Sequence, residues 1–293
     1  MATLADPSLA HVPAPSRGRT LAAALAANAS FRLGLVLFAV PLLAVVAGGF
    51  VLEPPAMDPL VRLRPPSIEH PFGTDNVGRD LLARVLLGGR ISLAIGVSVA
   101  AAATTAGVAI GLLAGFLRGV DAVVMRLMDG LMAIPGILLA IALMSVAGAG
   151  LLNVIVAITI TDIPRVVRLV RSIVLSLREQ TFVDAARMAG NTTARIIVRH
   201  LLPMTFGPLA VQATFICTSA IIVEALLSFI GAGTPPDLPS WGNVIAEGRN
   251  YFRIAPWIVL IPGFMIAATV LGINLMGDAL RDALDPRGAG AAR

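Results

Sequence analysis

Long uncharged apolar runs alternate with short polar segments along this chain. The runs lie near residues 33–52, 91–117, 130–149, 151–164, 205–230 and 255–276. A hydrocarbon layer about 30 Å thick takes about 20 mainly apolar residues in a helix, so each run is typical of a membrane span. The pattern predicts an all-α integral membrane protein with about six transmembrane helices, of which the fourth is the shortest.

The same pattern divides the chain into five parts. We expect an N-terminal tail (1–30), a first span (31–53), an external loop with a short amphipathic segment (54–90), a core of membrane helices (91–277) and a C-terminal tail (278–293). The first run starts too far from Met1, and is too long, for a cleaved signal peptide, so we expect a retained span.

Composition agrees with this class of protein. Of the 293 residues, 57% are hydrophobic and 13% are charged, and the mean hydropathy is +0.88, which is unlike ordinary soluble domains. Cys217 is the only cysteine. It permits no intrachain disulfide and no cysteine metal cluster, and we interpret it as an apolar packing residue.

The charges predict the orientation in the membrane. All 22 basic residues are arginines, and seven of them lie between residues 165 and 200, where they face only Glu179 and Asp184. The segments 53–90 and 231–255 are neutral. The positive-inside rule therefore places the 165–200 segment in the cytoplasm, and about six spans place both chain ends there too. The N-terminal tail agrees, with Arg17, Arg19 and Arg32 against Asp6.

The basic segment also has the composition of two short helices. Thr181–Ile197 lacks proline and is rich in Ala, Arg and Met, while Gly190-Asn191 is a natural helix stop. We expect a helix, a turn and a second helix, with Pro203 at the start of the next span, where its missing N–H is harmless.

A helix resting on anionic lipid is an equally simple interpretation of this basic segment. Nucleic-acid binding is disfavoured because Phe182 is the only aromatic residue present.

The residue pattern inside this segment favours a soluble partner. Asp184-Ala185-Ala186 is followed by Gly190 and, thirteen residues later, by Pro203. This spacing resembles the EAA loop of permease subunits in binding-protein-dependent ABC importers, with Asp184 where Glu is usual. The resemblance implies a coupling loop (165–203) that docks in a groove of a cytoplasmic ATPase. The docking residues it implies are Asp184, Ala185, Ala186, Arg187, Gly190, His200 and Pro203.

Other motifs narrow the resemblance to one branch of that family. They are His70–Asp75, Gly78-Arg79-Asp80, Gly89–Leu93, His200-Leu201-Leu202-Pro203, Ser228–Gly231, Pro239–Gly242 and Asp285-Pro286-Arg287. Together they resemble the C-type permease subunit of dipeptide, oligopeptide and nickel importers, over residues Phe31 to Arg287. The resemblance implies a type I importer (MetI-like) permease fold in the bacterial cytoplasmic (inner) membrane.

The resemblance also implies partners and a solute. This subunit would form half of a translocation pathway, beside a second homologous permease subunit, surrounding membrane lipid, two cytoplasmic ATPase subunits and an extracytoplasmic solute-binding protein. Peptides are the expected solute, with nickel, glutathione or opines as alternatives.

We expect no cofactor bound by this chain and no enzymatic activity in it, with ATP and Mg used by the partner ATPases. A chain without lysine lacks the lysine of a phosphate-binding loop.

The two outer segments offer contacts for an external protein. Asp75 follows a Gly-Thr turn, where it can cap the next helix, and its neighbours lack the ligand spacing of a metal site. Trp241 lies in a proline-rich segment, where we expect its indole to anchor the loop at the outer interface. Both residues are candidate contacts for a binding protein, and a plain surface connection is the alternative.

Two acids lie in or beside the apolar runs. Asp162 lies near the end of the fourth run and Glu224 inside the fifth. Glu224 could line the pathway, pair with a partner subunit, or make an internal hydrogen bond. An ion-coupled secondary transporter using either acid is the more remote alternative, because no inverted repeat is evident. Gly107, Gly111 and Gly115, four residues apart, predict a close helix-packing face.

Overall fold

The computed structural model describes residues 21–51, 53–235 and 237–284, and every regular element in these ranges is a helix. The predicted all-α architecture is confirmed. The outer parts of both expected tails, residues 1–20 and 285–293, lie outside the described residues.

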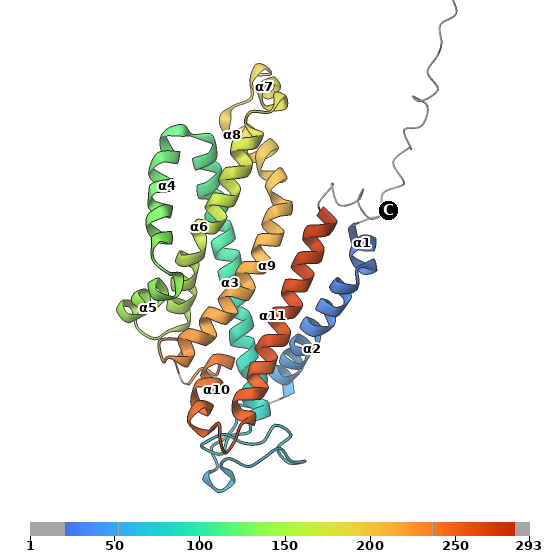
Figure 1. Ribbon diagram of the computed structural model, residues 1–293, viewed down its shortest axis with the longest axis vertical. Helices are drawn as coiled ribbons and strands as arrows, with labels where there is room; N and C mark the ends of the chain where they lie inside the picture. Colours follow the sequence, from blue (N-terminus) through green and yellow to red (C-terminus); the bar gives the residue numbers. More distant parts are fainter. Residues whose placement is uncertain (1–20, 52, 236, 285–293) are drawn as a thin grey trace, which may run out of the picture.

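Six passages of chain build one bundle (Figure 1). Five of them are long helices: α2 (Ala29–Val51), α3 (Leu81–Phe116), α6 (Leu151–Leu177), α9 (Leu202–Phe229) and α11 (Trp257–Leu284). The sixth is the pair α4 (Arg118–Ala133) and α5 (Gly136–Ala147). α7 (Thr181–Met188) and α8 (Thr193–Ile196) project at one end, here called the α7 end, and α1 (Leu21–Ala27) and the last turn of α11 point the same way. α10 (Trp241–Gly248) and the 53–80 loop close the opposite end, the α10 end.

Of the six passages, at most five are long and apolar enough to be membrane spans, one fewer than the predicted six. Four stretches are long and apolar enough to cross a membrane, namely Ala29–Phe50, Leu81–Phe116, Thr193–Phe229 and Trp257–Leu284, and α4 with α5 makes a bent fifth. α6 has 27 residues and is therefore about 40 Å long. It is not among these stretches, and it carries Asp162, Arg165 and Arg168 along its length.

The structure differs from the predicted boundaries in three places. The 130–149 run is bent by 90° between α4 and α5, because Ile134 precedes Pro135 and is excluded from helical geometry. The fourth span does not end near residue 164, since α6 continues through Pro164 to Leu177, so residues 165–177 are helix and not loop. Residues 81–90 are likewise the first turns of α3 and not a separate amphipathic segment.

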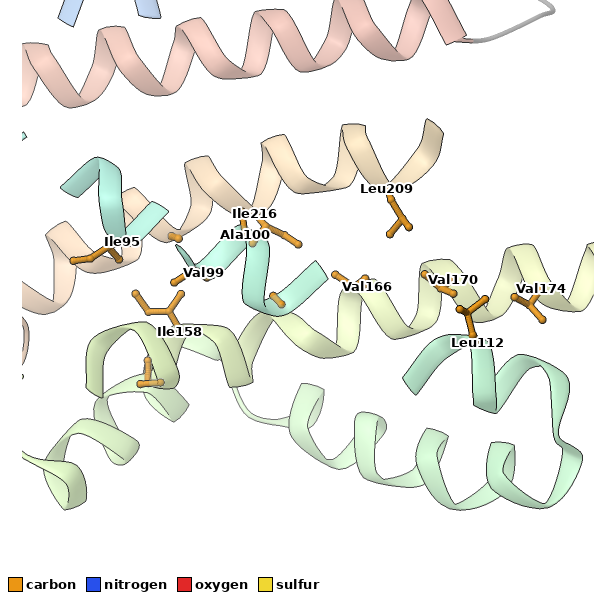
Figure 2. Close-up of a cluster of buried hydrophobic side chains, with 14 of the residues drawn as sticks. Ile95, Val99, Ala100, Leu112, Ile158, Val166, Val170, Val174, Leu209 and Ile216 are labelled. Atoms are coloured by element: carbon orange, nitrogen blue, oxygen red, sulfur yellow. The ribbon is translucent and has the colours of Figure 1, made fainter. Parts of the chain in front are cut away.

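The core of the bundle lies where α3, α6 and α9 meet (Figure 2). Val166, Val170 and Val174 of α6 are fully buried against α3. They lie over the three glycines of α3: a Cβ added at Gly111 would lie 2.8 Å from Val170 Cβ, and one added at Gly115 would lie 2.7 Å from Val174 Cβ. The predicted packing face at Gly107, Gly111 and Gly115 is confirmed.

A second apolar cluster joins α2, α3, α10 and α11 near the α10 end. Its buried members are Val45, Leu81, Val85, Leu86, Trp241, Val244, Ala255 and Ile258. This cluster attaches the first span to the remaining helices.

We expect Gly111→Ala to destabilise the protein by about 1–3 kcal/mol, because the added methyl group overlaps Val170 and the Val167 carbonyl. The measurement is the thermal unfolding midpoint of the purified protein in detergent. Gly263→Ala in α11 is the matched control, since a Cβ there meets nothing within 4 Å and alanine favours a helix. Equal midpoints for the two variants would contradict the close α3–α6 contact.

Candidate functional site

The basic segment folds as the predicted helix, turn and second helix. α7 is followed by Gly190, whose φ of +76° lies in the left-handed region that glycine adopts without strain. Gly190 N donates to Arg187 O at 2.9 Å and Asn191 N donates to Ala186 O at 3.1 Å, which caps the last carbonyls of α7. Gly190 thus sets the direction in which the chain turns back to the bundle.

α8 leads into α9 through a wide helical turn. Ile197–Leu201 form a π-helical turn, in which Leu202 N donates to Ile197 O. Pro203 occupies the start of α9, as predicted. Proline has no backbone N–H to donate to a helical hydrogen bond, and a wide turn can accommodate a residue that lacks this donor. His200 is half-buried in this turn and Pro203 is exposed.

The two faces of α7 have different surroundings. Val183 and Ala186 are buried and belong to the core cluster of the bundle. Asp184, Ala185 and Arg187 are exposed, and Met188 is 89% exposed. Six of the seven expected docking residues keep surface available to a partner, whereas Ala186 anchors α7 to the bundle.

Arg187 connects α7 to the end of α3. Its guanidinium lies 5.6 Å from the centroid of the Phe116 ring, and Nη1 donates to Asp184 Oδ1 at 3.2 Å. Arg178, just before α7, donates to Gly115 O at 3.0 Å. Side chains of α7 and of Arg178 therefore contact the last turn of α3.

At the α10 end, Asp75 lies in an ion cluster with Arg79, Arg84 and Glu247. The Asp75 carboxylate pairs with Arg79 Nε at 2.7 Å and with Arg84 Nη1 at 2.9 Å. Glu247 of α10 accepts from Arg79 Nη2 and Arg84 Nη1, each at 2.6 Å. The cluster ties the 53–80 loop to α3 and α10.

Two expectations for Asp75 are therefore wrong. Its side chain is fully buried, because two arginines and the backbone of residues 77 and 79 surround it, so it offers no contact to an external protein. It also does not cap the next helix: Asp80 does, by accepting from Ala83 N at 2.9 Å. Asp80 also bonds His70 Nδ1 at 2.9 Å.

The expectation that Trp241 anchors the outer interface and meets a binding protein is also wrong. Trp241 is fully buried. Its Nε1 donates to Val85 O at 2.9 Å and its backbone N donates to Ser92 Oγ at 3.2 Å. Gly89 makes room for the ring, since a Cβ there would lie 2.8 Å from Trp241 Cζ2.

The sequence of most of this bundle matches a known protein family. Residues 107–289 match the family described as binding-protein-dependent transport system inner membrane component. The match includes α7, the Gly190 turn and all of α9 and α11. The chain belongs to this family.

Relatives of this permease share most of its length. A putative peptide transport system permease protein of Brucella abortus is 47% identical over 291 residues, which is 98% of each chain. A dipeptide transport system permease protein of Alkalihalophilus pseudofirmus is 45% identical over 231 residues, covering 78% of this chain and 76% of the relative.

A solved structure has the same fold. The permease resembles a chain of the MetNI methionine ABC transporter in an inward-facing conformation, with a TM-score of 0.54 over 70% of this chain and 97% of that one, at 21% identity. The predicted MetI-like fold is confirmed.

Glu224 of this permease is fully buried. Its carboxylate accepts from Ser92 Oγ at 3.2 Å and from Ser228 Oγ at 2.8 Å. Among the three alternatives, the structure favours the internal hydrogen bond over a surface that lines a pathway or meets another subunit. Ser92 also accepts from Trp241 N, so Glu224 helps to hold the start of α10.

Asn243 organises the external loop but was not predicted to do so. Its Nδ2 donates to Thr234 Oγ1 at 2.9 Å and to Leu238 O at 3.1 Å, and its backbone N donates to Ser240 Oγ at 3.1 Å. The spacing Ser240-x-x-Asn243 was the available signal, since a serine that caps a helix accepts from the third residue after it.

We expect Arg84→Gln to lower the stability of the permease by about 3 kcal/mol, because it leaves the buried Asp75 short of positive charge. Arg90→Gln, which removes an exposed arginine from the same helix, should change stability by about 0.5 kcal/mol or less. Thermal unfolding in detergent measures both. If Arg84→Gln is as stable as Arg90→Gln, the ion cluster does not stabilise the α10 end.

Proposed function

We propose that this permease subunit imports short peptides as half of an ATP-driven transporter. A second homologous permease completes the pathway, and two ATPase subunits, which use ATP and Mg, bind at the α7 end. An extracytoplasmic binding protein delivers the solute at the α10 end. Family membership and the peptide names of close relatives support this proposal.

The observation that carries the proposal is the division of α7 into a buried and an exposed face. Its exposed face combines an acid, a small residue and the projecting Met188, a shape that fits a groove with an apolar floor. Its buried face contacts the core where α3, α6 and α9 meet. A helix held in this way can transmit the motion of a soluble partner to the membrane helices.

The two ends of the bundle suit different partners. The basic segment makes the α7 end positive, which agrees with a cytoplasmic location in the inner membrane. Both described chain ends point to that side (Figure 1), so we place both termini in the cytoplasm. With Asp75 and Trp241 buried, the binding protein would meet exposed loop residues such as Leu60 and Ile68, which are 86% and 101% exposed.

We expect Ala185→Glu to abolish copurification of the ATPase subunits with the permease. The exposed Ala185 lies beside Asp184 on α7, so a glutamate adds bulk and like charge where the partner backbone would approach. The measurement is an affinity pull-down of the tagged permease from detergent-solubilised membranes.

Ala23→Glu is the matched control, because it places the same side chain at an exposed position of α1 near the same end. The ATPases should copurify with this control as with the wild type. Retention of the ATPases by Ala185→Glu would contradict docking on α7, and their absence from every sample would contradict the importer itself.

A further inference from the structure

α6 carries a row of polar residues on the side opposite Val166, Val170 and Val174. Thr161, Arg165, Arg168, Ser172 and Ser176 recur at steps of three or four, so they lie on one face of the helix. The side chains of Arg165 and Arg168 are 54% and 43% exposed. We call this row the polar strip.

The polar strip begins deep within the apolar length of the bundle. Arg165 precedes Val166, which packs at Gly107 of α3. Gly107 lies nine residues before the end of α3 at Phe116, which is about 14 Å of helix. Toward the α10 end, the same face of α6 is apolar and buried, because Val154 and Ile158 of the core cluster occupy it. The face therefore changes from apolar to polar partway along the helix.

Lipid is an unfavourable neighbour for such a face. Charged side chains within spans are costly in hydrocarbon, so they face water or protein. Ser172 and Ser176 continue the strip toward the α7 end of α6. A polar row that runs from the middle of a span to its end is the expected lining of a water-filled passage.

Both signs of charge are exposed on this surface. Arg168 Nη2 donates to Asp129 Oδ1 of α4 at 2.6 Å, and Asp129 is 60% exposed. Arg165 Nη1 donates to Asp162 Oδ1 at 2.8 Å. Within the described chain these pairs engage one nitrogen of each guanidinium, and a guanidinium has five N–H donors. Donors therefore remain for another anion.

We propose that the polar strip and Asp129 line the cytoplasmic half of the translocation pathway and bind the charged ends of the peptide. Arg165 and Arg168 receive its carboxylate, and Asp129 receives its ammonium group. This inference rests on the proposed function. A zwitterionic peptide matches the strip because it carries both charges on one short molecule.

Cysteine labelling tests whether water reaches the strip. Cys217 is the only natural cysteine, so Ser172→Cys in a Cys217→Ala background reports on one position. In inside-out vesicles that hold the whole transporter, a membrane-impermeant maleimide should label Ser172→Cys. It should not label Leu43→Cys, which lies on an apolar, exposed part of α2. A folded but unlabelled Ser172→Cys would overturn the inference and indicate that the partner permease covers the strip.

Uptake of alanyl-alanine by the reconstituted transporter, with its binding protein, tests the role of the charges. Arg168→Gln should lower the maximal uptake rate about tenfold, the effect of losing one hydrogen bond to a charged group. The concentration of loaded binding protein that gives half-maximal uptake should not change. Arg168→Lys should restore much of the rate, and Arg118→Gln, an exposed arginine at the start of α4, should match the wild type.

ATP hydrolysis separates this role from a structural one. Binding of peptide by Arg168 predicts that Arg168→Gln keeps the ATP hydrolysis stimulated by loaded binding protein while uptake falls. Equal loss of both rates, or normal uptake by Arg168→Gln, would overturn the inference but not the proposed function. A wild-type transporter that imports no peptide would overturn the proposed function as well.

Discussion

The close approach of α3 and α6 determines where the other parts of this permease lie. Glycines on α3 and valines on α6 repeat at the same four-residue interval, so the two helices stay in contact over several turns. Because the valines take the inward face of α6, its arginines must face outward. The same contact holds the end of α6 beside Phe116, and this is where α7 begins. The packing of the bundle, the outward position of these charges and the place of α7 thus follow from three glycine–valine pairs.

Much of this arrangement could be predicted from local sequence. The apolar runs, the glycine interval on α3 and the Gly190 stop depend on residues close together in the chain, and the structure agrees with the glycine interval, the Gly190 stop and most of the runs. The end of the fourth span was not predictable in this way. Pro164 and the arginines beyond it favour a loop locally, but burial of Val166, Val170 and Val174 against α3 outweighs that preference.

The α10 end was harder to predict because its partners are distant in the sequence. Arg84 meets Glu247, 163 residues further on, and Trp241 enters the space left by Gly89. No local pattern shows that such residues are paired and buried. Side-chain hydrogen bonds and ion pairs add to the apolar cluster at this end, whereas apolar contacts dominate beneath α7. The two ends of the bundle are therefore stabilised by different combinations of contacts.

The π-helical turn at Ile197–Leu201 has a consequence for the whole of α9. One residue more or fewer in a helix rotates everything after it by about 100°. Leu201, Leu209 and Ile216 all lie in the core, and they do so in the phase that this wide turn imposes. A single-residue deletion between Gly190 and Leu201 would therefore change the rotational phase between α8 and the core face of α9 by about 100°. The number of residues in the short connection between α7 and α9 is therefore as important as their identity.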